Sequence, residues 1–157
     1  MANMAQAIRM ALHYAEENLG VTDVFGEDVG PPLGGVFTAT QGLKTAWNSP
    51  LDERGIIGCA IGLALAGQRP VAEIQFCDYI FNTIDLLKIA GNTHWASNGD
   101  WNVPMVVRTP VGSGIRGRPL PLAQLRRDDD PHPGMEGRHA LHPARCLRAA
   151  ALGLPGP

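Results

Sequence analysis

The sequence predicts an α/β fold in which a mainly parallel sheet is flanked by helices. Residues 4–18 repeat apolar side chains at the i, i+3, i+4 spacing of an amphipathic helix. Beyond them, short apolar runs alternate with longer helical segments, an order typical of a parallel sheet with connecting helices. In such sheets the ligand crevice lies beyond the carboxyl ends of the strands. We therefore expect the loops that begin at Gly26, Gln75 and Pro110 to meet at one edge.

The first elements are a helix, a strand and a loop. The helix covers residues 4–18, and Asn18 and Gly20 supply its stop. Val21–Phe25 is a short apolar strand. The PPLGG segment that follows is predicted as a loop, because two prolines and two glycines sustain neither a helix nor a central strand.

The remaining elements continue the alternation. Gln41–Trp47 is predicted as a short helix, ended by the Asn-Ser-Pro that follows it. Arg54–Gly67 is predicted as a buried helix with close backbone packing at Gly58 and Gly62. A strand, a helix and a last strand are then expected over Pro70–Gln75, Tyr79–Ala96 and Met105–Thr109.

Charge and composition exclude several classes of partner. The formal net charge of the 157 residues is -2 and no basic cluster occurs, so neither nucleic acid nor an anionic membrane surface is an expected partner. The three cysteines lack metal-ligand spacing, which is typical of structural thiols in a reducing compartment. Without a signal core or an apolar run that could span a bilayer, a cytoplasmic location is expected.

Amino-acid usage changes abruptly after residue 117. Residues 118–157 contain no Val, Ile, Phe, Tyr, Trp, Lys, Ser, Thr or Asn, and Arg, Pro, Leu, Ala and Gly fill the segment instead. Such a segment has little with which to form a strand or a well-specified core. We expect two parts: a partial domain over residues 1–117 and a tail of low order over residues 118–157.

Four segments resemble the beta subunits of 2-oxoacid dehydrogenase complexes in order and spacing. They are FGEDVG with GGVF (25–30 and 34–37), SPLDERGIIG (49–58), RPVAEIQFCDYIF (69–81) and PMVVRTPVGSGIRG (104–117). The third segment is more similar to the branched-chain (2-oxoisovalerate) type than to the pyruvate type. The resemblance covers essentially all of residues 1–117 and implies a thiamine-diphosphate pyrimidine-binding-type domain, here truncated.

The resemblance implies an oxidoreductase subunit that decarboxylates small branched 2-oxoacids and transfers the acyl group to a lipoyl acyltransferase. Thiamine diphosphate would be shared with an alpha subunit in an α2β2 heterotetramer, with magnesium on the alpha side. A pyruvate or acetoin dehydrogenase beta subunit, a non-catalytic fragment and an interaction module remain alternatives. The 157-residue form is expected to be inactive, because the family continues with a histidine-rich loop and a second domain that this sequence does not match.

The resemblance assigns the catalytic and cofactor-binding carboxylate to Glu53. This residue matches the family glutamate that hydrogen-bonds N1′ of the thiamine aminopyrimidine and favours the imino tautomer, whose nitrogen can take the thiazolium C2 proton. By spacing alone, Asp52-Glu53-Arg54 is better explained as an acidic first helical turn stabilised by the helix dipole. Tyr79 matches the family position whose ring lines the aminopyrimidine pocket, and an ordinary half-buried tyrosine is the alternative.

No phosphate or metal motif accompanies these residues. Gly30, Gly34 and Gly35 do not fit G-x-G-x-x-G between a strand and a helix, and no P-loop lysine follows them. Some relatives also bind potassium through backbone carbonyls. By position these would be the carbonyls of Val103, Met105 and Val106.

Our hypothesis for the tail is a single-base frameshift near Gly117. With suitable codons, residues 119–127 read one base later give HYHSHSFDA, similar to the family's histidine loop, and residues 133–143 give PGWKVVMPSTP. Met135-Glu136 must be encoded ATG-GA, so the shifted frame reads tryptophan there whatever the codon. A divergent tail is the alternative. Independent genomic reads with an intact frame to Pro157 would contradict the frameshift.

Overall fold

The computed structural model describes residues 3–35 and 38–110, and these residues form a four-stranded parallel sheet with helices on both faces. The strands are β1 (Asp23–Gly26), β2 (Ala46–Asn48), β3 (Pro70–Glu73) and β4 (Val106–Arg108), in the spatial order β2-β1-β3-β4. The α/β class and the parallel sheet are confirmed. The tail expected over residues 118–157 lies outside the described residues.

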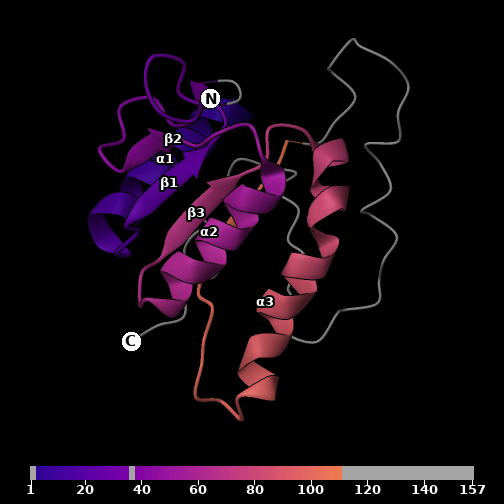
Figure 1. Ribbon diagram of the computed structural model, residues 1–157. Helices are drawn as coiled ribbons and strands as arrows, with labels where there is room; N and C mark the ends of the chain where they lie inside the picture. The colour runs from indigo at the N-terminus through magenta and orange to yellow at the C-terminus, as the bar shows by residue number, and fades with distance from the viewer. Residues whose placement is uncertain (1–2, 36–37, 111–157) are drawn as a thin grey trace.

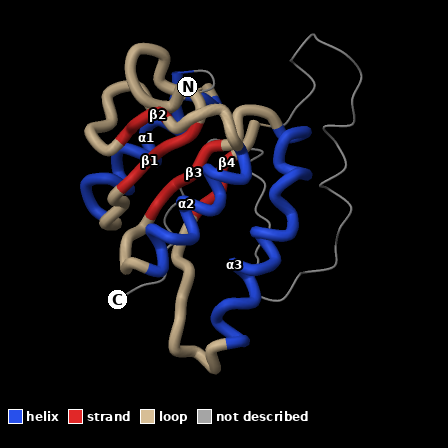
Figure 2. The backbone as a smooth tube through the Cα atoms, viewed as in Figure 1, coloured by secondary structure: helices blue, strands red, loops and turns tan. Residues whose placement is uncertain are grey.

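Helices cover the two faces of the sheet (Figure 1). On one face lie α2 (Glu53–Leu65), the 3-10 helix η2 (Cys77–Thr83) and α3 (Ile84–Ala96), and α1 (Met4–Asn18) lies on the other. Figure 2 shows the strands side by side between these layers. Over the described residues, none of the helices has the length and apolar character needed to cross a membrane.

Alternate residues of the strands fill two separate cores. Val24 and Val71 face α1, whereas Phe25 and Ala72, both without exposed surface, face α2. The central strands β1 and β3 are therefore covered on both faces, as their apolar runs in the sequence indicated.

The first helix forms as predicted. Its N-terminus carries a capping box. The Asn3 side chain accepts from the Gln6 backbone N–H at 2.9 Å, and the Gln6 side chain accepts from the Asn3 backbone N–H at 2.9 Å. The helix ends before Gly20, whose φ of +69° is left-handed.

The predicted helix over Gln41–Trp47 is wrong. Gly42 has a φ of +87°, which breaks a right-handed helix, and Ala46–Asn48 instead pairs with Val24–Gly26 as the edge strand β2. The Trp47 ring stacks on Phe25, with ring centroids 4.3 Å apart and planes 2° from parallel. Pairing with β1 and this ring contact override the local helical pattern.

Two details of the later helices also differ from expectation. Gly58 and Gly62 do not mark close packing, because a Cβ added at either position would meet no atom within 4 Å. The segment predicted as one helix from Tyr79 begins as η2 and becomes α-helical only at Ile84. The buried Thr83 hydroxyl donates to the Ile80 carbonyl at 2.7 Å within this tighter stretch.

Candidate functional site

Three strands end together at one edge of the sheet, as the sequence predicted. Gly26 of β1 is in register with Glu73 of β3, which is in register with Arg108 of β4. A side chain at Gly26 would overlap the Glu73 carbonyl, so the close approach of β1 and β3 here requires glycine. The chain segments that follow the three strands therefore begin at the same edge.

An ion pair closes the β3–β4 side of this edge. Glu73 is 1% exposed, and its carboxylate pairs with the guanidinium of Arg108. Gly35 packs directly over Glu73, since an added Cβ would lie 3.1 Å from Glu73 Oε2. The pair thus joins two strand ends and supports the loop that contains Gly35.

Glu53 is the first residue of α2 and is half-buried at this edge. Its Oε2 accepts a hydrogen bond of 3.3 Å from the Asn82 side-chain amide. The preceding N-cap residue, Asp52, makes no side-chain capping bond, so its carboxylate leaves the first-turn N–H groups of α2 uncapped. Glu53 therefore lies at the start of α2, and its role as a site residue stays a prediction.

A second carboxyl group that the sequence analysis missed is buried near Glu53. Glu27 directly follows β1 and is 5% exposed, and neither of its side-chain oxygens has a hydrogen-bond partner among the described residues. Burial raises the pKa of Glu27, and the charges of Glu53 and Asp28 raise it further. An acidic residue at the carboxyl end of an apolar strand was the signal that could have found it.

Together, Glu27 and Glu53 form an acid pair with unequal surroundings. A buried carboxyl with a raised pKa, beside a half-buried and hydrogen-bonded carboxyl, is an arrangement that can hold or transfer a proton. Groups with perturbed pKa values gather at functional sites.

Tyr79 lies in η2, which begins beyond the carboxyl end of β3. Its ring is 46% exposed and meets the edge of Phe76, with centroids 5.5 Å apart and an interplanar angle of 79°. The contact ties the tyrosine to its own segment, and its role in an aminopyrimidine pocket stays a prediction.

The potassium site also stays a prediction. Val103, Met105 and Val106 are half-buried, and the Val103 carbonyl already accepts a bond of 2.9 Å from the Met105 N–H. A carbonyl keeps a second lone pair, so that bond does not exclude a cation ligand. Over residues 3–35 and 38–110, His, Cys, Asp and Glu side chains form no cluster of three that could hold a metal ion.

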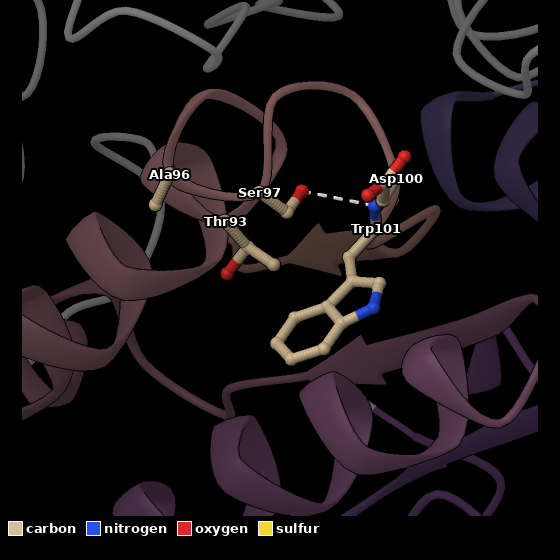
Figure 3. A pocket seen from close by; sticks show the side chains of 5 residues that line it. All are labelled: Thr93, Ala96, Ser97, Asp100 and Trp101. Atoms are coloured by element: carbon tan, nitrogen blue, oxygen red, sulfur yellow. Dashed lines mark hydrogen bonds between the residues drawn. The ribbon is translucent and has the colours of Figure 1, made fainter.

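The hollows on the surface of residues 3–35 and 38–110 include two of different size. The larger, about 340 Å³, is lined by Thr93, Ala96, Ser97, Asp100 and Trp101 at the C-terminal end of α3 (Figure 3). In this hollow the Ser97 hydroxyl oxygen accepts a hydrogen bond of 2.9 Å from the Trp101 backbone N–H. The smaller, about 160 Å³, adjoins the start of α2 and is lined by Phe25, Trp47, Ser49, Pro50, Asp52, Gly55, Ile56 and Cys59. The smaller hollow includes Asp52, the residue that precedes Glu53, but Glu53 itself does not line it.

A family model of the transketolase pyrimidine-binding domain matches residues 1–119. The chain belongs to this family. The carboxyl-edge acid pair thus sits in a pyrimidine-binding domain, and the expected fold class is that of the family.

Relatives of this pyrimidine-binding domain are dehydrogenase subunits. The chain is 44% identical over 121 residues to the 2-oxoisovalerate dehydrogenase subunit beta of Pseudomonas aeruginosa, covering 73% of this chain and 34% of the relative. It is 41% identical over 118 residues to the Bacillus subtilis protein of the same name, covering 71% and 36%. The pyruvate dehydrogenase E1 component subunit beta of Bacillus subtilis is 41% identical over 121 residues, covering 71% and 36%.

The resemblance to 2-oxoacid dehydrogenase beta subunits is therefore confirmed. The choice between the branched-chain and pyruvate types is not decided, because both names occur at similar identity. The chain spans about a third of the length of these curated relatives.

Proposed function

We propose that the chain is the N-terminal part of a beta subunit of a thiamine-diphosphate-dependent 2-oxoacid dehydrogenase. The branched-chain reaction is our first choice: oxidative decarboxylation of a small branched 2-oxoacid with acyl transfer to a lipoyl acyltransferase. The placement of Glu53 beside buried Glu27, in a pyrimidine-binding domain, carries the proposal. Pyruvate is the in-family alternative, supported by the pyruvate dehydrogenase relatives.

The residues at the carboxyl edge fit the pyrimidine end of the cofactor. Glu53 has a carboxylate oxygen, Oε1, to which the described residues make no hydrogen bond, and it can accept one from an aminopyrimidine N–H. The hollow at the start of α2 is walled by Phe25, Trp47 and Ile56, which suits a flat, weakly polar ring. Thiamine diphosphate, when bound, supplies the electron sink for decarboxylation.

Within this arrangement the protein's own task is to hold and move a proton. Glu53 would orient the ring and exchange a proton with it at N1′. Glu27, whose pKa is raised, would keep a second negative charge away from Glu53 while it remains protonated. Tyr79 would line the ring from the η2 side.

The diphosphate end requires a partner in this proposal. The described residues offer neither a phosphate-binding glycine motif nor a cluster of metal-binding side chains. We assign the diphosphate and its magnesium to an alpha subunit in an α2β2 heterotetramer. Val103, Met105 and Val106 would bind potassium through their carbonyls.

Calorimetric titration of thiamine diphosphate tests the proposal. We expect binding when the chain is combined with the alpha subunit of a 2-oxoisovalerate dehydrogenase and magnesium, and none with the alpha subunit alone. For any measurement on the Glu53→Gln variant of the chain, Glu17→Gln is the matched control, because Glu17 is exposed near the end of α1. A mixture that binds no more cofactor than the alpha subunit alone would favour the interaction-module or fragment alternatives. A substrate panel on a frame-restored complex then separates branched 2-oxoacids from pyruvate.

A further inference from the structure

Two adjacent residues of α2 are bonded to the junction between η2 and α3. Glu53 accepts from the Asn82 side chain, and Arg54 Nη1 donates to the Asn82 backbone carbonyl at 2.7 Å. The same guanidinium forms a two-pronged pair with Asp85, with distances of 2.7 and 2.8 Å. Asn82 is therefore held at its backbone and linked through its side chain to the proposed acid–base group.

The backbone around Asn82 is also fixed from the core. Thr83, which follows it, is fully buried and donates its hydroxyl to the carbonyl of Ile80 at 2.7 Å. Ile80 belongs to the core that α2 and β3 share. Arg54 on the solvent side and Thr83 on the core side thus leave the Asn82 backbone little freedom to move.

From these contacts we propose that Asn82 is a positioning residue that sets the orientation of the Glu53 carboxylate, and that the Arg54–Asp85 clamp holds Asn82 in place. The inference rests on the proposed function of Glu53 and extends it to three residues that the sequence analysis did not single out. The Asn82 amide occupies Oε2 and leaves Oε1 for the aminopyrimidine. A carboxylate held in one orientation loses less freedom when the ligand arrives.

The chemistry of Asn82 suits this task. A side-chain amide donates to a carboxylate without competing for its proton in the neutral pH range, whereas a nearby lysine or carboxyl would change the charge of the pair. Arg54 is likewise suited to clamping, because a planar guanidinium can bind a carboxylate through two parallel bonds and still donate to a carbonyl.

Nuclear magnetic resonance of the full 157-residue chain tests the proposal without cofactor. The side-chain amide signals of Asn82 are expected to change with pH in the wild type, and this pH dependence should be lost in Glu53→Gln. Asn92, exposed on α3, is the control, and its amide should not respond to Glu53→Gln. A pH dependence of Asn82 that persists unchanged in Glu53→Gln overturns the contact and with it the proposal.

A second variant tests the clamp. Arg54→Lys keeps the positive charge but loses the two-pronged geometry, so the Asn82 response to Glu53 should weaken while the chain stays folded. An unchanged response would show that Arg54 does not hold Asn82. If Asn82 were only structural, replacing it would lower the melting temperature, but its amide signals would show no pH dependence linked to Glu53. The spectrum therefore separates a structural role from a positioning role.

Failure of this inference is distinguishable from failure of the proposed function. Cofactor binding with the alpha subunit, in the absence of the Asn82 response, overturns only the role of Asn82. The Asn82 response without any cofactor binding contradicts the proposed function and shows that the hydrogen bond serves another role in the fold.

Discussion

Replacing Glu53 by glutamine should damage catalysis far more than folding. Glutamine keeps the shape of the side chain and can still accept from Asn82, but it loses the negative charge that favours the imino form of the aminopyrimidine. Loss of a positioned acid–base group typically costs about 10²- to 10⁴-fold in rate. We expect turnover to fall on this scale in a frame-restored protein assembled with its alpha subunit, with a much smaller change in cofactor affinity.

The stability change from the same substitution should be small. Removing a negative charge from the first turn of α2 costs about 0.3–1 kcal/mol through the helix dipole. Removing that charge also relieves its repulsion of Glu27, which acts in the opposite direction and lowers the pKa of Glu27 toward its ordinary value. The net change in unfolding free energy should therefore stay within about 1 kcal/mol.

Turnover and melting temperature measured on one Glu53→Gln preparation separate the two explanations. The exposed Glu17→Gln variant should leave both quantities unchanged. Normal turnover with a lowered melting temperature would refute the reasoning and leave Glu53 as a helix-terminal structural residue.

Three further predictions concern folding. Because the pKa of Glu27 is raised in the fold, its stabilising effect is present at acid pH and lost as pH rises above the ordinary value of 4.5. Glu27→Gln should therefore gain stability relative to the wild type as pH rises from below 4.5 in urea unfolding, and a constant difference would contradict this. Arg54 lowers the pKa of Asp85 from 3.8 to about 2. The wild type should therefore lose stability relative to Asp85→Asn as pH falls from 3.8 toward 2, and parallel acid-unfolding curves would contradict this. Gly26→Ala should lower the unfolding free energy by about 1–3 kcal/mol, because the added methyl group overlaps Glu73. Gly62 has open space around it, so Gly62→Ala should stabilise α2 by about 0.5–1 kcal/mol. Equal effects of the two variants in chemical denaturation would contradict the packing described.

The sequence was sufficient for the fold class, the order of most elements and the edge at which the site lies. Periodicity identified α1 because it buries a regular apolar face, and the apolar composition of Arg54–Gly67 predicted α2 as a buried helix. Strand composition identified β1 and β3 because both faces of each are covered. Local pattern failed at β2, where the decisive interactions are pairing with β1 and the stacking of Trp47 on Phe25. It also failed at Gly58 and Gly62, since a sequence does not show which helical glycines face open space.

For the candidate site, family resemblance predicted Glu53, and only the three-dimensional structure identified its neighbours. Glu27 lies 26 positions before Glu53 in the chain, and Asn82, which bonds to Glu53, lies 29 positions after it. No local spacing links these three residues. The parallel sheet brings the end of β1 close to the start of α2, and the packing of η2 against α2 brings Asn82 within reach.

The central claim is that Glu53 exchanges a proton with the aminopyrimidine of thiamine diphosphate. Its most direct test is the rate of hydrogen–deuterium exchange at thiazolium C2, measured by rapid quench and proton resonance in a frame-restored complex with the alpha subunit. We predict rapid exchange with wild-type and Glu17→Gln chains, and a rate about 10²- to 10⁴-fold lower with Glu53→Gln at saturating cofactor. Equal exchange rates in all three complexes would contradict the claim.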